Sequence, residues 1–238
     1  MSRVLAIMMA LMVCGVTTAA TINVPGDYAS IQDAIDASAN GDEILVAPGT
    51  YTGTDSEVVD MLGKAITIRA TGTSEETILD GEGARRVVLG SSGEGADTVI
   101  EGFTITGGNI SWGGGIFCAQ SSPTIIDCTI SGNTVSNGGG IYCYSNSHPT
   151  LSGCTISDNT ATNDGGGIYC FNSSSPTITG CTISDNTSGE GGGISCSYDS
   201  NPTLTDCEIL NNNADDVGGG IYCYLSSPTL TECEIGYN

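Results

Sequence analysis

The sequence predicts an all-β solenoid of parallel coils, and a repeated phrase in its second half is the main reason. The phrase consists of three glycines followed by Ile, then by an aromatic residue or Ser, and then by Cys. It occurs five times, at steps of 25, 27, 26 and 27 residues. A fixed period of this length indicates stacked units that bury their apolar faces against one another. The copies lie at residues 113–118, 138–143, 165–170, 191–196 and 218–223.

Within each period, apolar and polar residues alternate over short runs, as at residues 168–171 and 181–184. Alternation of β-branched residues indicates strands rather than helices. Gly, Ser, Asn and Pro separate the runs, which leaves no room for a helical crossover between strands. About three strands per coil fit the period, with successive coils expected about 4.8 Å apart.

Stacking would place equivalent residues of successive coils over one another as columns. Three apolar columns are expected to point inward, one of them formed by Ile116, Ile141, Ile168, Ile194 and Ile221. An asparagine column is expected at a turn, because amides can bond from coil to coil and Asn tolerates left-handed backbone. Its members are Asn133, Asn159, Asn186, Asn212 and Asn238.

The chain divides into three segments. Residues 1–20 combine Arg3, an apolar stretch too short to span a bilayer and small residues, which predicts a secretory signal and a secreted or outer-surface protein. Residues 21–63 contain a helix at 30–38, expected to cap the open end of the stack, and the first strands. Residues 64–238 form the coils, with regular repeats from about residue 102. The expected early strands are 43–46, 66–69, 78–80 and 86–89.

The charge of the chain is strongly acidic and unevenly distributed. The formal net charge is −22, and no Lys or Arg follows Arg86. Such a surface repels nucleic acid and acidic polysaccharide, and favours cations and neutral partners. Neutral polysaccharide and cell-surface proteins are therefore the expected partners. No segment after the signal is apolar enough to cross a membrane.

Four phrases resemble secreted bacterial right-handed parallel β-helix proteins of the pectin-lyase-like superfamily. They are Thr-Ile-Asn-Val-Pro at 21–25, Ile-Gln-Asp-Ala-Ile at 31–35, Val-Ala-Pro-Gly-Thr-Tyr at 46–51 and Gly-Phe-Thr-Ile-Thr-Gly-Gly at 102–108. The repeats also resemble those of chlamydial polymorphic outer-membrane proteins, which carry Gly-Gly-Ala-Ile and Phe-x-x-Asn. The resemblance implies a right-handed parallel β-helix of about eight coils. It implies no single function, because that superfamily includes lyases, hydrolases, epimerases and non-catalytic adhesins.

Ten of the eleven cysteines belong to the repeats and form two expected columns. The first contains Cys118, Cys143, Cys170, Cys196 and Cys223, and the second Cys128, Cys154, Cys181, Cys207 and Cys233. Buried free thiols, disulfides between the columns, and metal ligation are the three alternatives. Five residues per column cannot all pair within it, which favours free thiols.

Aromatic residues between the inward Ile and Cys are expected to point outward as two exposed columns. These columns are a candidate platform for a neutral glycan or a partner protein. The alternative is stacking that only stabilises the sheet. The residues are Phe117, Tyr142, Tyr169 and Tyr222 in one column, and Tyr144, Phe171 and Tyr224 in the other.

Catalysis has one weak candidate pair. Asp158 and Asp185 occupy equivalent turn positions on adjacent coils, and two carboxylates suffice for glycoside hydrolysis. A lyase needs basic groups that the repeats lack, and Arg85–Arg86 is expected to be a solvated turn. The favoured interpretation is therefore a non-catalytic protein for adhesion, carbohydrate contact or scaffolding. The alternative is a polysaccharide lyase or glycoside hydrolase of the same fold.

Calcium is the one cofactor that the acids indicate. Asp164, Glu190, Asp215 and Asp216 lie just before glycine triplets, and carboxylate oxygens suit calcium. No sequence motif of a calcium-binding loop accompanies them. The last coil carries no helix or polar cap, so a further segment or another subunit is expected to cover it.

Overall fold

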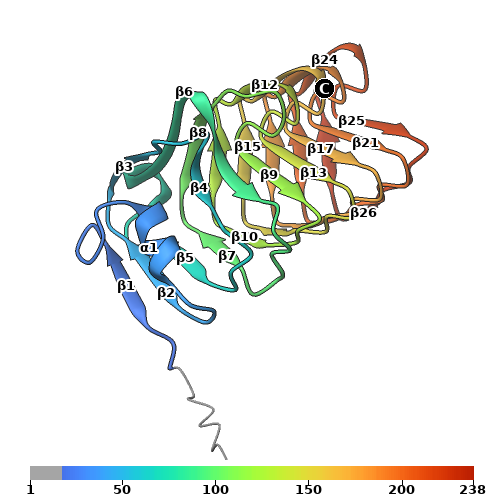
Figure 1. Cartoon of the computed structure of the whole chain (residues 1–238). Helices are drawn as coiled ribbons and strands as arrows, with labels where there is room; N and C mark the ends of the chain where they lie inside the picture. Colours follow the sequence, from blue (N-terminus) through green and yellow to red (C-terminus); the bar gives the residue numbers. More distant parts are fainter. Residues whose placement is uncertain (1–17) are drawn as a thin grey trace, which may run out of the picture.

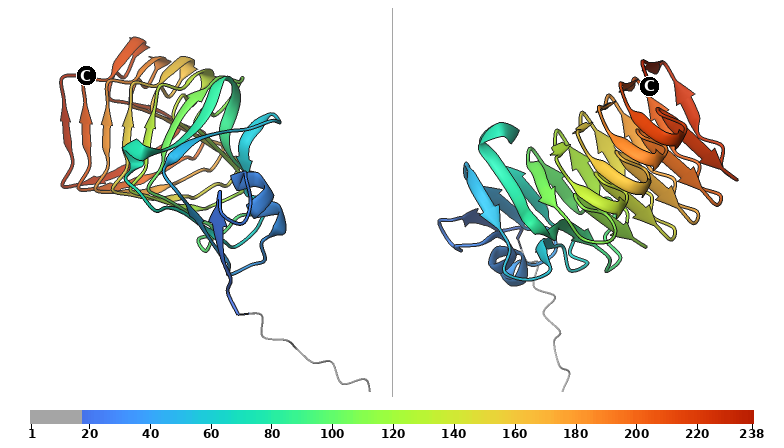
Figure 2. Two further views of the ribbon diagram at one scale, coloured as in Figure 1. Left: turned by 90° about the vertical axis from the view of Figure 1, so that its left-hand side faces the viewer. Right: turned by 90° about the horizontal axis from the view of Figure 1, so that it is seen from above.

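The computed structural model describes residues 18–238 and shows a solenoid of about eight stacked coils (Figures 1 and 2). The predicted signal at residues 1–20 lies, except for its last three residues, outside the described part. Every strand pair is parallel, so the predicted all-β parallel solenoid is confirmed. No helix within residues 18–238 is long and apolar enough to span a bilayer.

Nine strands form one sheet that runs the length of the molecule. In spatial order they are β1 (Thr21–Val24), β2 (Glu43–Val46), β5 (Thr67–Ala70), β7 (Val99–Glu101), β10 (Thr124–Ile126), β14 (Thr150–Ser152), β18 (Thr177–Thr179), β22 (Thr203–Thr205) and β26 (Thr229–Thr231).

A second sheet of 14 strands covers two further faces, which meet at the long strand β6 (Thr77–Gly90). One face contains β9 (Ile116–Ala119), β13 (Ile141–Tyr144), β17 (Ile168–Phe171), β21 (Ile194–Ser197) and β25 (Ile221–Tyr224), and β4 (Glu57–Asp60) pairs with β6 there. The other contains β3 (Gly49–Thr52), β8 (Thr104–Gly108), β11 (Thr129–Ser131), β15 (Thr155–Ser157), β19 (Thr182–Ser184), β23 (Glu208–Leu210) and β27 (Glu234–Gly236).

A third sheet of four strands gives the regular coils a fourth face. It contains β12 (Thr134–Asn137), β16 (Thr160–Asp164), β20 (Thr187–Glu190) and β24 (Asn213–Val217). The prediction of about three strands per coil missed this face, because its strands are polar and lack a clear alternation. Their pairing register also shifts, for example between Val135 and Asn137.

Two further predictions of strands need correction. Residues 78–80 and 86–89 belong to a single strand, β6, rather than to two. Its first part pairs with β3 and its last part with β4, and its register against β8 shifts between Asp80 and Arg85. The strand predicted at 66–69 begins and ends one residue later.

The single α-helix of the described chain, α1 (Ile31–Ala37), lies at the N-terminal end of the stack (Figure 1). The side chain of Ser30 caps it by accepting a hydrogen bond from the Asp33 amide at 3.1 Å. At the other end, Lys64 Nζ donates to the carbonyls of Asp36 and Ser38, both at 2.9 Å, where a cation is favoured. A short 3₁₀ turn, η1 (Ser74–Glu76), precedes β6.

The interior of the regular coils is a set of in-register apolar columns. Ile141 pairs with Ile116 and Ile168, and the first column is buried from Ile116 to Ile194. In the last coil, Leu230 and Ile235 are more exposed than their counterparts.

Buried asparagines form a polar column inside the stack. Each Nδ2 donates to the Oδ1 of the next asparagine at 2.9–3.0 Å, along the series Asn133, Asn159, Asn186, Asn212 and Asn238. Each also donates to a backbone carbonyl of the preceding coil, as Asn159 does to Ile130 at 2.8 Å. These amides thereby satisfy backbone groups that would otherwise be buried without partners.

The expected left-handed backbone lies one residue earlier than the asparagines. Gly132, Asp158, Asp185 and Asn211 have φ values of +67°, +55°, +56° and +55°. The corner therefore falls on the residue before each buried amide, and the asparagines are selected for hydrogen bonding rather than for backbone conformation.

A serine column that the sequence analysis missed runs through another corner of the coil. The backbone amides of Ser121, Ser147, Ser174 and Ser200 each donate to the hydroxyl of the next serine at 3.1–3.3 Å. At its start, buried Glu94 accepts from the Ser121 hydroxyl and from the amides of Gly63 and Ser92 at 2.8 and 2.9 Å.

The glycine triplets allow the coils to approach one another at the asparagine column. A Cβ on Gly166 would lie 2.5 Å from the carbonyl oxygen of Gly192 and 2.6 Å from that of Thr187. The first glycine of this triplet, Gly165, has a φ of +63°, a conformation that L side chains rarely adopt. Both constraints explain why the triplet recurs.

The ten repeat cysteines are free thiols in two columns. Those of the first column pair in register, Cys143 with Cys118 and Cys170. Eight are buried, whereas Cys223 and Cys233 in the last coil are not. Burial raises the pKa of the Cys128 thiol to about 12, which keeps it protonated and unreactive.

We predict that Asn159→Ala destabilises the protein by about 2–4 kcal/mol, because it leaves several buried donors and acceptors without partners. Unfolding by urea, followed by circular dichroism, measures the loss. Asn163→Ala, an exposed asparagine on β16, serves as the control and should change the free energy of unfolding by less than about 0.5 kcal/mol. Equal effects of the two substitutions would contradict a structural role of the column.

We also predict that iodoacetamide alkylates all ten repeat cysteines in the denatured, unreduced protein. In the native protein, the eight buried thiols should be protected because the reagent cannot reach them. Peptide mass mapping distinguishes the two states. A cysteine pair that stays unlabelled after denaturation would show a disulfide.

Candidate functional site

The five strands β9, β13, β17, β21 and β25 carry most of the aromatic residues of the repeats on their outer face. In each strand, the first and third residues point into the coil, so the second and fourth point outward. Parallel pairing in register then aligns Phe117, Tyr142 and Tyr169 in one column and Tyr144 with Phe171 in the next. We call this surface the aromatic face.

The rings of the aromatic face stack from coil to coil. The centroids of Tyr142 and Tyr169 lie 4.9 Å apart with planes inclined by 17°, and those of Tyr144 and Phe171 lie 6.0 Å apart at 11°. Phe117 is tilted against Tyr142 at 5.4 Å. These are favourable ring geometries that stabilise the sheet.

The prediction of two exposed columns is wrong for Tyr142 and Tyr169, whose exposed fractions are only 8% and 6%. Neighbouring rings on both sides and the second column cover them. Burial accordingly raises the pKa of both hydroxyls. Tyr144 and Tyr224 are the members that remain exposed, at 38% and 46%. The face therefore combines a buried column that stabilises the sheet with an exposed rim, and its use as a binding platform stays a prediction.

Tyr198 belongs to the aromatic face although the sequence analysis did not include it. In β21, serines occupy both outward positions, and the next residue, Tyr198, has a φ of +56°. Its ring packs edge-on between Phe171 at 5.1 Å and Tyr224 at 5.3 Å. The sequence contains a signal for this placement, since Tyr198 directly follows Ser197, the serine that occupies an aromatic position of the column.

Two adjoining hollows lie along the aromatic face. The first, of about 360 Å³, is lined by Trp112, Asn137 and the rings from Phe117 to Phe171. The second, of about 370 Å³, is lined by Tyr198, Tyr222, Tyr224, Asp164 and Glu190 among others. Tyr169 and Phe171 contribute to both. Each volume is within the range of small-ligand sites.

Arg86 closes the N-terminal end of the aromatic face. Its guanidinium lies 4.6 Å from the Phe117 centroid and pairs with Glu57 at 3.1 Å. The side chain is largely buried, and burial lowers the pKa of Arg86 while Glu57 opposes that shift. The expectation that Arg85–Arg86 is a solvated turn is therefore wrong, because both residues lie within β6 and neither is exposed.

Of the four calcium candidates, two lie together. Asp164 and Glu190 pair in register on β16 and β20 and line the second hollow. Burial, and then the charge of Glu190, raises the pKa of Asp164. Asp215 and Asp216 are exposed on β24. Within residues 18–238, no three His, Cys, Asp or Glu side chains form a group that could hold a metal, so calcium stays a prediction.

Asp158 and Asp185, the candidate catalytic pair, are exposed residues in left-handed backbone conformation. They follow β15 and β19, which belong to a different face of the coil from the aromatic rings. Their conformation accounts for their residue type, since Asp, Asn and Gly adopt it most readily. A hydrolytic role for them stays a prediction.

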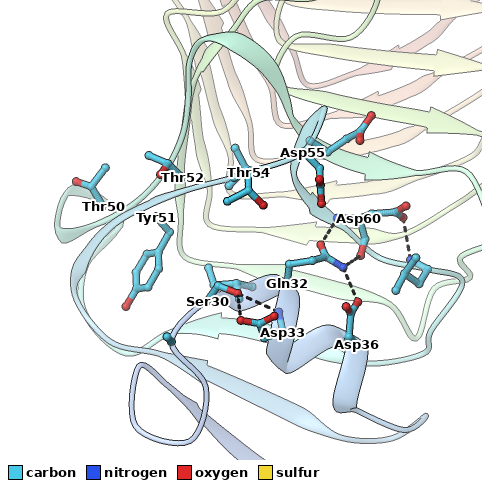
Figure 3. Close-up of a pocket in the computed structure, with 16 residues that line it drawn as sticks. Ser30, Gln32, Asp33, Asp36, Thr50, Tyr51, Thr52, Thr54, Asp55 and Asp60 are labelled. Carbon is cyan, nitrogen blue, oxygen red and sulfur yellow. Dashed lines mark hydrogen bonds between the residues drawn. The ribbon is translucent and has the colours of Figure 1, made fainter.

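A larger hollow of about 770 Å³ lies between α1 and the segment from β3 to β4, where the sequence analysis expected no site (Figure 3). Gln32 lies between two of its acids, donating to Asp36 at 2.9 Å and accepting from the Asp60 amide at 2.8 Å. Burial first, and then nearby carboxylates, raises the pKa of Asp60. Its lining is polar and acidic, with Tyr51 as its aromatic member.

Comparison with known proteins identifies the architecture but no relative of stated activity. The model of a family described as "right handed beta helix region" matches residues 46–238. A search among curated proteins finds no match to the chain.

We predict that Tyr169→Ala lowers the free energy of unfolding by about 3 kcal/mol, because it empties a buried place between stacked rings. Tyr144→Ala, which removes a ring from the exposed rim, should cost only about 1 kcal/mol. Urea unfolding of the two variants tests this difference. Equal losses would contradict the distinction between a buried column and an exposed rim.

Proposed function

The chain belongs to the right-handed beta helix family, and we propose that it is a secreted, non-catalytic protein that holds neutral polysaccharide by its aromatic face. The fold of this family does not by itself fix a function, so the proposal rests on the surface of this chain. Adhesion to a glycan-bearing surface is the biological role that this contact would serve.

The rim of half-exposed rings beside two adjoining hollows is the observation that carries this proposal. Tyr144, Tyr198 and Tyr224 each present an apolar ring and a polar hydroxyl to solvent. That combination suits the C–H faces and hydroxyl groups of a sugar. The hollows follow one another along the solenoid, which suits an extended chain rather than a single small molecule.

The charge of the protein supports a ligand that is not acidic. With a net charge of −22 and no Lys or Arg after Arg86, the repeats would repel uronate polymers and nucleic acid. Secretion is supported by the features of residues 1–20. The resemblance to secreted pectin-lyase-like proteins and to chlamydial outer-membrane repeats agrees with it.

A lyase is disfavoured because each basic side chain of the described residues has a structural partner. Lys64 donates to carbonyls at the end of α1, and Arg69 bridges Glu43 and Glu101 at 3.0 and 2.9 Å. Arg85 pairs with Glu82, and Arg86 with Glu57. The geometry therefore favours binding over proton abstraction beside a carboxylate.

We predict that the protein binds a neutral β-1,4-glucan, with cellohexaose as the probe in titration calorimetry. Replacing both Tyr144 and Tyr224 by Ala should weaken binding by about thirtyfold, since each ring contributes about 1 kcal/mol. Tyr237→Ala is the matched control, because Tyr237 is 90% exposed and lies after β27, on a different face. Unchanged affinity of the double variant, or no binding by the unaltered protein, would refute this function.

A further inference from the structure

The second hollow exists because the aromatic column is interrupted. In β21, Ser195 lies between Tyr169 and Tyr222, and Ser197 lies between Phe171 and Tyr224. The nearest rings within each column are therefore two coils apart, a backbone separation of about 10 Å at twice the strand spacing. Both serines are buried, and Ser197 lines the hollow. Because Ser195 is fully covered, the space available to a ligand is the open hollow above the serines, where a group would lie against the rings of Tyr169 and Tyr222.

Two carboxylates lie at this gap. Asp164 and Glu190 come from neighbouring strands of the third sheet and line the same hollow as Tyr169 and Tyr222. The Ser195 hydroxyl donates to Asp164 at 3.4 Å, which holds that carboxylate toward the gap. Since no Lys or Arg follows Arg86, no basic side chain of the repeats neutralises the pair.

The N-terminal end of the aromatic face contains a cation held between an aromatic ring and a carboxylate. There Arg86 places a cation 4.6 Å from the centroid of Phe117 and 3.1 Å from a carboxylate oxygen of Glu57. A ring face and a carboxylate together favour a cation more than either does alone. The second hollow offers the same two components, and their complement is a positively charged ligand.

We propose that the second hollow binds an ammonium group of a polysaccharide, so that the aromatic face prefers amino-sugar polymers with free amines over neutral or acidic ones. This proposal rests on the proposed carbohydrate contact: neutral polysaccharide remains a ligand, and amino-sugar polymers are the class that binds more tightly. A polymer is the occupant because the first hollow adjoins the second through Tyr169 and Phe171, which places neighbouring sugar rings side by side.

Three hexasaccharides with the same β-1,4-linked backbone test the preference, since they differ only at carbon 2. Cellohexaose carries a hydroxyl there, the N-acetylglucosamine hexamer an acetamide, and the glucosamine hexamer an ammonium group at about pH 6, where such amines are protonated. Calorimetry should show the glucosamine hexamer binding about tenfold more tightly than the other two. High salt should reduce that advantage.

Charge-removing variants locate the preference. Asp164→Asn combined with Glu190→Gln should abolish the tenfold advantage, so that the glucosamine hexamer and cellohexaose bind the variant with equal affinity. The matched control is Asp158→Asn combined with Asp185→Asn, which removes two carboxylates from adjacent coils on a different face and should keep the advantage.

The outcomes separate this proposal from the proposed function. Equal affinity for the three hexasaccharides overturns the ammonium preference and leaves the carbohydrate contact standing. The ammonium preference is also overturned if the control variant loses the tenfold advantage of the glucosamine hexamer to the same extent, because general attraction of a cation to an acidic protein would then explain that advantage. Failure of all three sugars to bind overturns both proposals. Binding of a lysine-rich peptide without the glucosamine hexamer would replace the sugar by a protein partner.

Discussion

In-register stacking of the coils is the constraint on which every other feature depends. Backbone hydrogen bonds set the spacing, but they alone permit sliding along the strands. The glycine triplets and the buried asparagine amides remove that freedom, since each amide must meet the next at 2.9–3.0 Å while Gly166 lies against the carbonyl of Gly192. A slip by one residue would turn the isoleucine columns outward and the aromatic columns inward.

The candidate site follows from the same constraint. An aromatic residue that recurs at an outward position forms a continuous stack of rings along the coils. A non-aromatic residue at that position in one coil interrupts the stack. The serines of β21 create such a gap, and Tyr198 closes part of it from a left-handed turn. The candidate site is therefore set by departures from the repeat, whereas the repeat itself provides stability.

The two ends of the aromatic face differ in charge because the basic residues are confined to the early coils. Arg86 is held against Phe117 and Glu57 at one end. Asp164 and Glu190 lie at the other, where the acidic repeats supply no counterion. If the proposed carbohydrate contact holds, this polarity would orient an extended ligand along the coils.

The sequence alone determined the period, the strands with clear alternation and the inward apolar columns, because these are properties of local alternation and spacing. It did not reveal the polar strands of the third sheet, which lack such alternation. It also placed Asp164 and Glu190 at equivalent positions. Only the tertiary structure decided that Tyr142 and Tyr169 are buried, that Tyr198 joins the aromatic face, and that α1 borders an acidic hollow. Exposure and cavities depend on how neighbouring side chains cover one another, and the repeat pattern of a sequence does not contain that information.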